Sequence, residues 1–181
     1  MPLNRAGICR PWSSPRLSVA CSTPGFRAQQ RRHEMEHHHS ADILAIHMVC
    51  KDLAVRSACL VDQQDYETLV QLFTTDATLV RPGGSPLVGR EQILASYQGK
   101  PRERLTRHFI TNSVVYEADA NSARVTSYVL LWSTTSDTPL EAFGRKADAR
   151  QAAGQFDDLI VRTDEGWRIA QRSASFQMYR E

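Results

Sequence analysis

The sequence has no hydrophobic run of the roughly 20 residues that cross a bilayer, so we expect no transmembrane segment. It also lacks cysteines at metal-binding spacings, because its four cysteines are scattered at positions 9, 21, 50 and 59. Cys50 and Cys59 would lie about two and a half turns apart on a helix and on different faces, which disfavours a disulfide. We therefore predict free thiols in a reducing, cytoplasmic compartment and no metal site.

The chain as a whole has little excess of either charge, since its formal net charge is +2. The charge is unevenly distributed along the chain. Residues 1–34 carry six arginines and one acidic residue, whereas the remainder carries 16 basic and 19 acidic residues. The folded part is thus mildly acidic, and we predict that it binds no nucleic acid.

The first 40 residues contain four prolines and no sustained hydrophobic periodicity. We predict that residues 1–40 form a disordered basic extension and that residues 41–181 form one domain. Two origins of the extension stay open. Translation could begin at Met35, or the Arg- and Ser-rich segment could be an organellar targeting sequence.

The order of the expected elements predicts an α+β fold. An amphipathic helix should begin at Ser40 or Asp42 and run to Asp62, a second should follow the capping residue Asp65 and end at 74–76, and a third should begin at Gly89. Long strands are expected at 106–116, 124–133, 153–162 and 167–179, with a short strand at 77–80 and a short helix near 147–150. We predict a curved antiparallel sheet of four to six strands that wraps around the N-terminal helices and forms a cone-shaped pocket.

The strand at 106–116 combines polar and aliphatic side chains. Because side chains alternate along a strand, His108, Ile110 and Asn112 are expected on one face. A mostly apolar wall with a few polar groups is typical of a ligand pocket. The alternative is a solvated strand surface on which His108 is simply hydrogen-bonded.

Six motifs, in this order, resemble the SnoaL-like branch of the nuclear-transport-factor-2-like superfamily. They are Asp62-x-x-Asp65-Tyr66, Leu-Phe-x-x-Asp-Ala (72–77), Gly-Arg-Glu-x-Ile (89–93), Arg-His-x-x-x-Asn (107–112), Phe-x-Asp (156–158) and Val-Arg-x-x-x-Gly-Trp-Arg (161–168). The resemblance implies a cone-shaped pocket and a homodimer formed through the outer face of the sheet.

The resemblance to dehydratase and dehydrochlorinase members of this branch implies that Asp62 and His108 are a catalytic pair. The carboxylate would orient the imidazole, and the imidazole would remove a proton next to a leaving group. No cofactor would be required. The sequence departs from the dehydratase pattern at Val61, which replaces a tyrosine, and strand 124–133 has no second histidine. On residue type alone, Asp62 could equally be an ordinary turn residue.

Further candidates for contacts with a substrate are Asn112, Tyr66, Tyr128, Trp132, Phe156 and Asp158. Each has a structural alternative: the aromatic residues could be core residues, Asn112 could bond a neighbouring strand, and Asp158 could pair with Arg172 or Arg168. The sequence therefore predicts a small lyase, isomerase or cyclase that acts on a hydrophobic small molecule and has no membrane association. The alternative is a non-catalytic ligand-binding module, or an accessory subunit resembling the small subunits of ring-hydroxylating dioxygenases.

Overall fold

The computed structural model describes the backbone of residues 24–181 and the side chains of residues 42–181. Residues 39–181 form one compact unit. The helices and strands are α1 (Pro24–Gln63), α2 (Tyr66–Val70), β1 (Phe73–Val80), β2 (Leu87–Val88), α3 (Gly89–Gln98), β3 (Arg104–Ala118), β4 (Ser122–Thr135), β5 (Leu140–Glu141), β6 (Gly144–Arg145), β7 (Gln151–Thr163) and β8 (Gly166–Arg180). In the described backbone, no helix combines the length and the apolar character that a membrane span needs.

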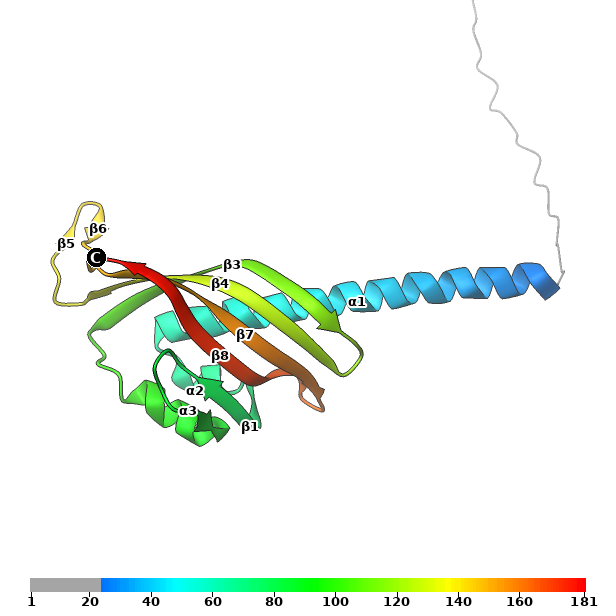
Figure 1. The fold of residues 1–181 in the computed structure, drawn as a ribbon, viewed down its shortest axis with the longest axis horizontal. Helices are drawn as coiled ribbons and strands as arrows, with labels where there is room; N and C mark the ends of the chain where they lie inside the picture. Colours follow the sequence, from blue (N-terminus) through cyan, green and yellow to red (C-terminus); the bar gives the residue numbers. More distant parts are fainter. Residues whose placement is uncertain (1–23) are drawn as a thin grey trace, which may run out of the picture. The chain divides into compact units, whose positions relative to one another are not determined.

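A six-stranded curved sheet forms the body of the fold, in the order β2-β1-β8-β7-β4-β3 (Figure 1). The four long strands that the sequence predicts are present and pair antiparallel. The pairing of β1 with β8 is parallel, whereas the sequence predicted an antiparallel sheet. These two strands are far apart in the chain, so no hairpin forces them to be antiparallel. The predicted α+β fold, with N-terminal helices and a curved sheet, is confirmed.

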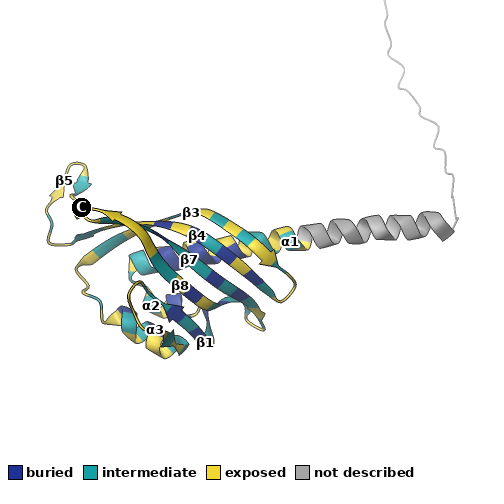
Figure 2. Cartoon of the chain, in the orientation of Figure 1, coloured by how far each residue is buried: buried dark blue, intermediate teal, exposed yellow. Residues whose placement is uncertain are grey.

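Alternating burial along the strands places the core on one face of the sheet. In β4 the buried side chains of Val125, Ser127 and Val129 alternate with the exposed side chains of Tyr128 and Leu130, a banding visible in Figure 2. The inner face packs with buried side chains of the three helices, and this core includes Cys50, Leu53, Leu69, Phe73, Leu79, Ile93, Val125, Ile160 and Ile169. Full burial of one such large aliphatic or aromatic side chain contributes about 1.5–3 kcal/mol.

Several predicted boundaries of helices differ from the structure. The predicted start of α1 is wrong, because the helix begins at Pro24. Residues 26–39 contain no glycine or proline to stop a helix, and proline is favoured at its first position. Of the extension predicted to be disordered, residues 1–23 lie outside the described residues. Asp65 caps α2 as predicted, but the helix ends at Val70. Residues 147–150 form no helix, and the segment before them carries the β5–β6 hairpin instead.

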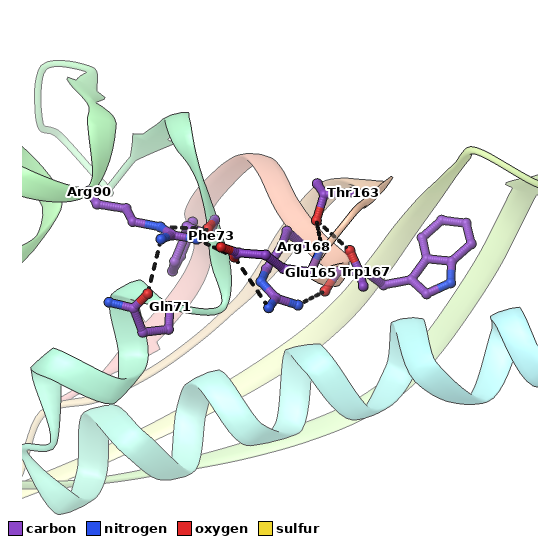
Figure 3. Close-up of polar contacts among 8 residues, drawn as sticks. Gln71, Phe73, Arg90, Thr163, Glu165, Trp167 and Arg168 are labelled. Carbon is purple, nitrogen blue, oxygen red and sulfur yellow. Dashed lines mark hydrogen bonds and ion pairs between the residues drawn. The ribbon is translucent and has the colours of Figure 1, made fainter.

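Three of the motifs that suggested the family meet in one polar cluster (Figure 3). Arg90 donates two hydrogen bonds to the carbonyl oxygen of Phe73, at 2.9 and 2.7 Å, and one to Gln71 Oε1. Arg90 and Arg168 both lie 3.5 Å from Glu165 Oε2. The cluster joins the start of α3 to the start of β1 and the β7–β8 turn, so these motif arginines have a structural role.

Candidate functional site

Asp62 and His108 are in direct contact where the end of α1 meets β3. The Asp62 Oδ1 atom lies 2.6 Å from His108 Nδ1, and Asp62 Oδ2 accepts a hydrogen bond of 2.8 Å from the backbone N–H of His108. The hydroxyl of Thr106 donates a third bond, also 2.8 Å, to Asp62 Oδ1. Only 11% of the Asp62 side chain and 15% of the His108 side chain are exposed, so solvent screens this pair weakly. Two residues of one strand therefore hold the carboxylate in a fixed position.

The hydrogen bonds around Asp62 determine its charge and assign the tautomer of His108. Burial raises the pKa of Asp62, but the bonds from the His108 ring, the His108 backbone and Thr106 outweigh burial, so the pKa lies below its usual value. Asp62 is therefore a carboxylate near neutral pH. A carboxylate only accepts hydrogen bonds, so His108 must donate from Nδ1–H, and a neutral ring then carries its lone pair on Nε2.

Gln64 fixes the turn that carries Asp62. It has a positive φ of 59° at the C-terminus of α1. Two backbone bonds, from Gln64 N to Val61 O and from Asp65 N to Leu60 O, close a Schellman-type end of the helix. The Gln64 side-chain amide donates to the carbonyl oxygens of Arg102 and Arg104, at 2.9 and 3.0 Å. The end of α1 is thus tied both to β3 and to the loop that precedes it.

His108 lines a mostly apolar, partly open cavity of about 240 Å³. Its wall comes from α1, β1, α3, β3, β4, β7 and β8, and its apolar members include Val61, Leu79, Val129, Leu131 and Phe156. Gly154 also borders it, opposite a bulge in β8, where Gln177 is left without a partner between Phe176 and Met178. A Cβ atom on Gly154 would lie 2.0 Å from the carbonyl oxygen of Ser175, so only glycine allows this close approach of β7 to β8. The imidazole therefore faces an apolar chamber of the size of a small ligand.

Arg172 and Asp158 form a buried ion pair beside the cavity. Arg172 Nε and Nη2 each donate to one Asp158 oxygen at 2.7 Å, and Nη1 donates to Ser57 Oγ at 2.7 Å. Burial opposes the charge of Arg172, yet the Asp158 carboxylate outweighs this and raises the pKa of Arg172. The guanidinium also stacks on the Phe156 ring, with 4.3 Å to its centroid. Asp158 does not line the cavity itself, and both its oxygens accept hydrogen bonds from Arg172.

The expectation that Asn112 shares a face with His108 is wrong. The pairing of β3 with β4 shifts register between Thr111 and Val114, and Asn112 has a positive φ of 49° at this bulge. An extra residue in one strand reverses the alternation beyond it. Asn112 is consequently exposed and lies outside the cavity.

Three of the predicted ligand-contacting aromatic residues also lie outside the cavity. Tyr128 and Trp132 are 51% and 41% exposed and point away from the core, because they alternate with the inward Val129 and Leu131. Tyr66 stacks on Tyr97 at a centroid distance of 5.3 Å and does not reach the cavity wall, whereas Tyr97 does. Of the aromatic candidates, only Phe156 lines the cavity.

The described residues contain no group of three or more His, Cys, Asp or Glu side chains that could hold a metal ion. Cys50 and Cys59 are both free thiols, the first buried and the second exposed. The cavity wall instead carries three basic side chains that were not predicted to line it, Arg81, Lys100 and Arg172. Thr106 and Gln64 were also missed. The spacing of Thr106 and His108 on one strand face could have revealed Thr106, but no local pattern reveals the long-range bonds of Gln64.

Comparison with known proteins identifies the fold. The sequence profile of the SnoaL-like domain matches residues 30–173. A search of curated proteins finds no match.

Solved structures give the same result. A protein of Novosphingobium aromaticivorans, provisionally assigned as a scytalone dehydratase, superposes with a TM-score of 0.66 at 19% identity, covering 77% of this chain and 89% of that one. A type 2 hexachlorocyclohexane dehydrochlorinase superposes with a TM-score of 0.65 at 18% identity, covering 77% and 90%. An NTF2-like protein with a cystatin-like fold, also from N. aromaticivorans, gives 0.55 at 19% identity, covering 87% and 92%. At such identities the likeness is one of fold, and activity has to be argued from the site.

Proposed function

Because the chain belongs to the family of SnoaL-like domains, we propose that it is an enzyme in which His108 removes a proton from carbon in a hydrophobic small molecule, without a cofactor. Asp62 is the residue that orients the base. The observation that carries the proposal is the 2.6 Å contact between Asp62 Oδ1 and His108 Nδ1 at the wall of an apolar cavity. Relatives of this fold that bear the names of a dehydratase and a dehydrochlorinase agree with it.

The first step follows from the tautomer of His108. Its Nε2 lone pair takes a proton from a substrate carbon, and the ring becomes an imidazolium whose charge is balanced by Asp62. The electron pair of the broken C–H bond stays on the substrate. A neighbouring carbonyl group would hold that pair as an enolate, and the apolar wall keeps water from returning a proton too early.

The fate of this electron pair separates three reaction classes. In a lyase it forms a C=C bond while a leaving group departs with its own bonding pair. In an isomerase the imidazolium returns the proton to a different carbon. In a cyclase the carbanion attacks a carbonyl carbon of the same molecule. All three begin with the same proton transfer to His108, so a test of that transfer tests the proposal before the product is known.

Exchange of carbon-bound protons in deuterium oxide measures this step directly. Ring-bearing ketones with acidic C–H groups, such as 2-tetralone, would be followed by proton NMR with wild-type protein and with His108→Gln. We expect the wild type to accelerate exchange and the variant to lose the acceleration by about 10²–10⁴-fold, the usual contribution of a positioned general base. His47→Gln, the same change on a histidine outside the cavity wall, is the control. Equal exchange rates for wild type and His108→Gln would contradict the proposal and favour a pocket that only binds ligands.

We also propose that a second copy of the chain covers the outer face of the sheet. Phe109, Tyr128, Leu130 and Trp132 are all at least 37% exposed and lie together on β3 and β4, where Phe109 pairs with Leu130 and packs edge-on against Trp132. A contiguous apolar patch of this kind on a sheet face is typical of an interface. Light scattering should give a dimer for the wild type and a monomer for Leu130→Asp. A monomeric wild type at micromolar concentration would contradict the proposed dimer.

The predicted cytoplasmic location stays a prediction, supported by the free thiols of Cys50 and Cys59.

A further inference from the structure

One corner of the cavity holds two basic side chains on one aromatic ring. Arg81 directly follows β1, and Lys100 lies two residues beyond the end of α3. The Arg81 Cζ atom lies 4.5 Å and the Lys100 Nζ atom 4.4 Å from the centroid of Tyr97. All three residues line the same cavity as His108.

No carboxylate among the side chains of residues 42–181 compensates these two charges. The other ionisable groups of the wall have partners, since Asp158 pairs with Arg172 and Asp62 with His108. Arg81 and Lys100 form no ion pair with any acidic residue whose side chain the structure describes, and no Asp or Glu lines the cavity. The Arg81 guanidinium bonds Ser96 Oγ through Nη2, while its Nε–H is buried without a partner. Because this nitrogen is fully buried, contact with a ligand in the cavity falls to the other donors of these two side chains.

The lowered pKa of Lys100 also favours the binding of an anion in this corner. Burial, followed by the nearby charges of Arg81 and Arg104, lowers the pKa of Lys100 to about 8. Cation–π contacts with Tyr97 offset only part of the cost of placing two cations together. An anion bound between them would remove the repulsion and return the lysine to its charged form.

We propose that Arg81 and Lys100 bind a carboxylate group of the substrate, so that the substrate class is an apolar, ring-bearing carboxylic acid. The Arg81 guanidinium offers N–H donors and Lys100 offers ammonium donors, which suit a carboxylate. The apolar wall would hold the rings, and the reacting carbon would then lie toward His108. This inference rests on the proposed function for the role of His108, but the binding of the carboxylate does not depend on turnover.

A matched pair of probes tests the binding. 2-Naphthoate and 2-naphthamide have the same rings and nearly the same shape, and only the first is an anion. We expect titration calorimetry of the full-length protein at pH 7 to show naphthoate binding at least about tenfold more tightly, as expected for charge-assisted hydrogen bonds. Equal affinities, or no saturable binding of naphthoate up to millimolar concentration, would overturn the proposal.

Variants of Arg81 and Lys100 test whether these two residues cause the preference for naphthoate over naphthamide. Lys100→Met and Arg81→Met should each reduce the preference for naphthoate by about tenfold and leave the affinity for naphthamide unchanged. Lys100→Arg should retain the preference. Lys146→Met, an identical change at an exposed position outside the cavity, is the control for net charge. Lys100→Met should fold at least as well as the wild type, because it removes a charge that burial disfavours. Persistence of the full preference in Lys100→Met and Arg81→Met would overturn the assignment.

The pH dependence of the affinity for naphthoate tests the role of Lys100 independently of the variants. The groups that face Lys100 are Arg81, Arg104 and Tyr97. Lys100 should therefore lose its charge as the pH rises through about 8. The affinity for naphthoate should fall as the pH rises through about 8, while that for naphthamide stays constant. His108→Gln separates the two proposals, since it should abolish proton exchange and leave the naphthoate preference intact. If exchange proceeds without His108, the proposed function fails while the carboxylate site stands.

Discussion

Asp62 binds His108 at two points, through the ring Nδ1 at 2.6 Å and through the backbone N–H at 2.8 Å. The second contact means that the carboxylate positions the strand as well as the imidazole. With Thr106 as a third donor, all the bonds to Asp62 come from one short segment of β3. The pair is therefore both a candidate catalytic dyad and a joint between α1 and the sheet, and its variants should affect both turnover and stability.

Asp62→Asn should separate these two effects. The amide keeps one acceptor but replaces the other with a donor, so it cannot hold both Nδ1–H and the backbone N–H of His108. We expect proton exchange to fall by about 10²–10⁴-fold and the free energy of unfolding to fall by about 1.5–3 kcal/mol, the usual worth of bonds to a charged group. Exchange assays measure the loss of proton exchange, and urea titrations measure the loss of stability. Wild-type exchange in Asp62→Asn would contradict the role of Asp62 as the orienting partner.

The lowered pKa of Asp62 also predicts how stability depends on pH. In the folded state the carboxyl releases its proton at a lower pH than in the unfolded chain, where its pKa is about 3.9. Its ionised form therefore stabilises the fold above about pH 4, and this contribution is lost as the pH falls through the folded-state value. Urea titrations at several pH values measure the free energy of unfolding of both proteins. Near pH 6 the wild type should be more stable than Asp62→Asn, and this difference in stability should shrink below about pH 4. A difference that grows on acidification would contradict the shift.

Gln64 offers a test of the turn that carries Asp62. Gln64→Ala removes the bonds to Arg102 and Arg104 and keeps a side chain at a positive φ, whereas Gln64→Gly removes the bonds and relieves the strain. We expect both to reduce turnover, with the glycine variant more stable than the alanine variant by about 1 kcal/mol. Thermal unfolding compares them, and Gln63→Ala at the exposed neighbouring position is the control. Equal stability of the alanine and glycine variants would show that the backbone strain is unimportant.

The Asp158–Arg172 pair should be a structural requirement of the cavity wall. Asp158→Asn leaves the Arg172 guanidinium buried without its counter-charge, and we expect a loss of about 3–5 kcal/mol in the free energy of unfolding. The double variant Asp158→Leu with Arg172→Met should recover much of this loss, because it leaves no unpaired charge. Chemical denaturation measures the free energy of unfolding of the single and the double variant. A double variant less stable than the single one would indicate that the pair stabilises the fold beyond mutual neutralisation.

Sequence patterns predicted the framework of this fold well, and they did so where the physics is local. The four long strands follow from runs of β-branched and aromatic residues, and the cap at Asp65 follows from a side chain that bonds Thr68 N. The inward and outward faces of β4 follow from simple alternation. The pairing of Asp62 with His108 came from the resemblance to the family, and their separation by 46 residues in the chain leaves no local signal.

The parts that sequence patterns missed depend on long-range geometry. The bulge at Asn112 reverses the faces of β3. Asparagine tolerates a positive φ, but this preference alone does not locate a bulge within a strand. Tyr128 and Trp132 were candidates for contact with a substrate, with a core role as the alternative, but alternation with Val129 and Leu131 turns both outward. Arg81 and Lys100 look like ordinary basic loop residues in the sequence. Only the fold shows that both meet at Tyr97 inside the cavity.

The tautomer of His108 tests the central claim most directly. A two-dimensional ¹⁵N–¹H spectrum of the imidazole, recorded near pH 8 on uniformly labelled protein and assigned with His108→Gln, identifies which ring nitrogen carries the proton. We predict a protonated Nδ1 and a bare Nε2 in the wild type, with this preference lost in Asp62→Asn. A wild-type His108 protonated on Nε2 would have no lone pair facing the cavity, and its role as the base would be contradicted.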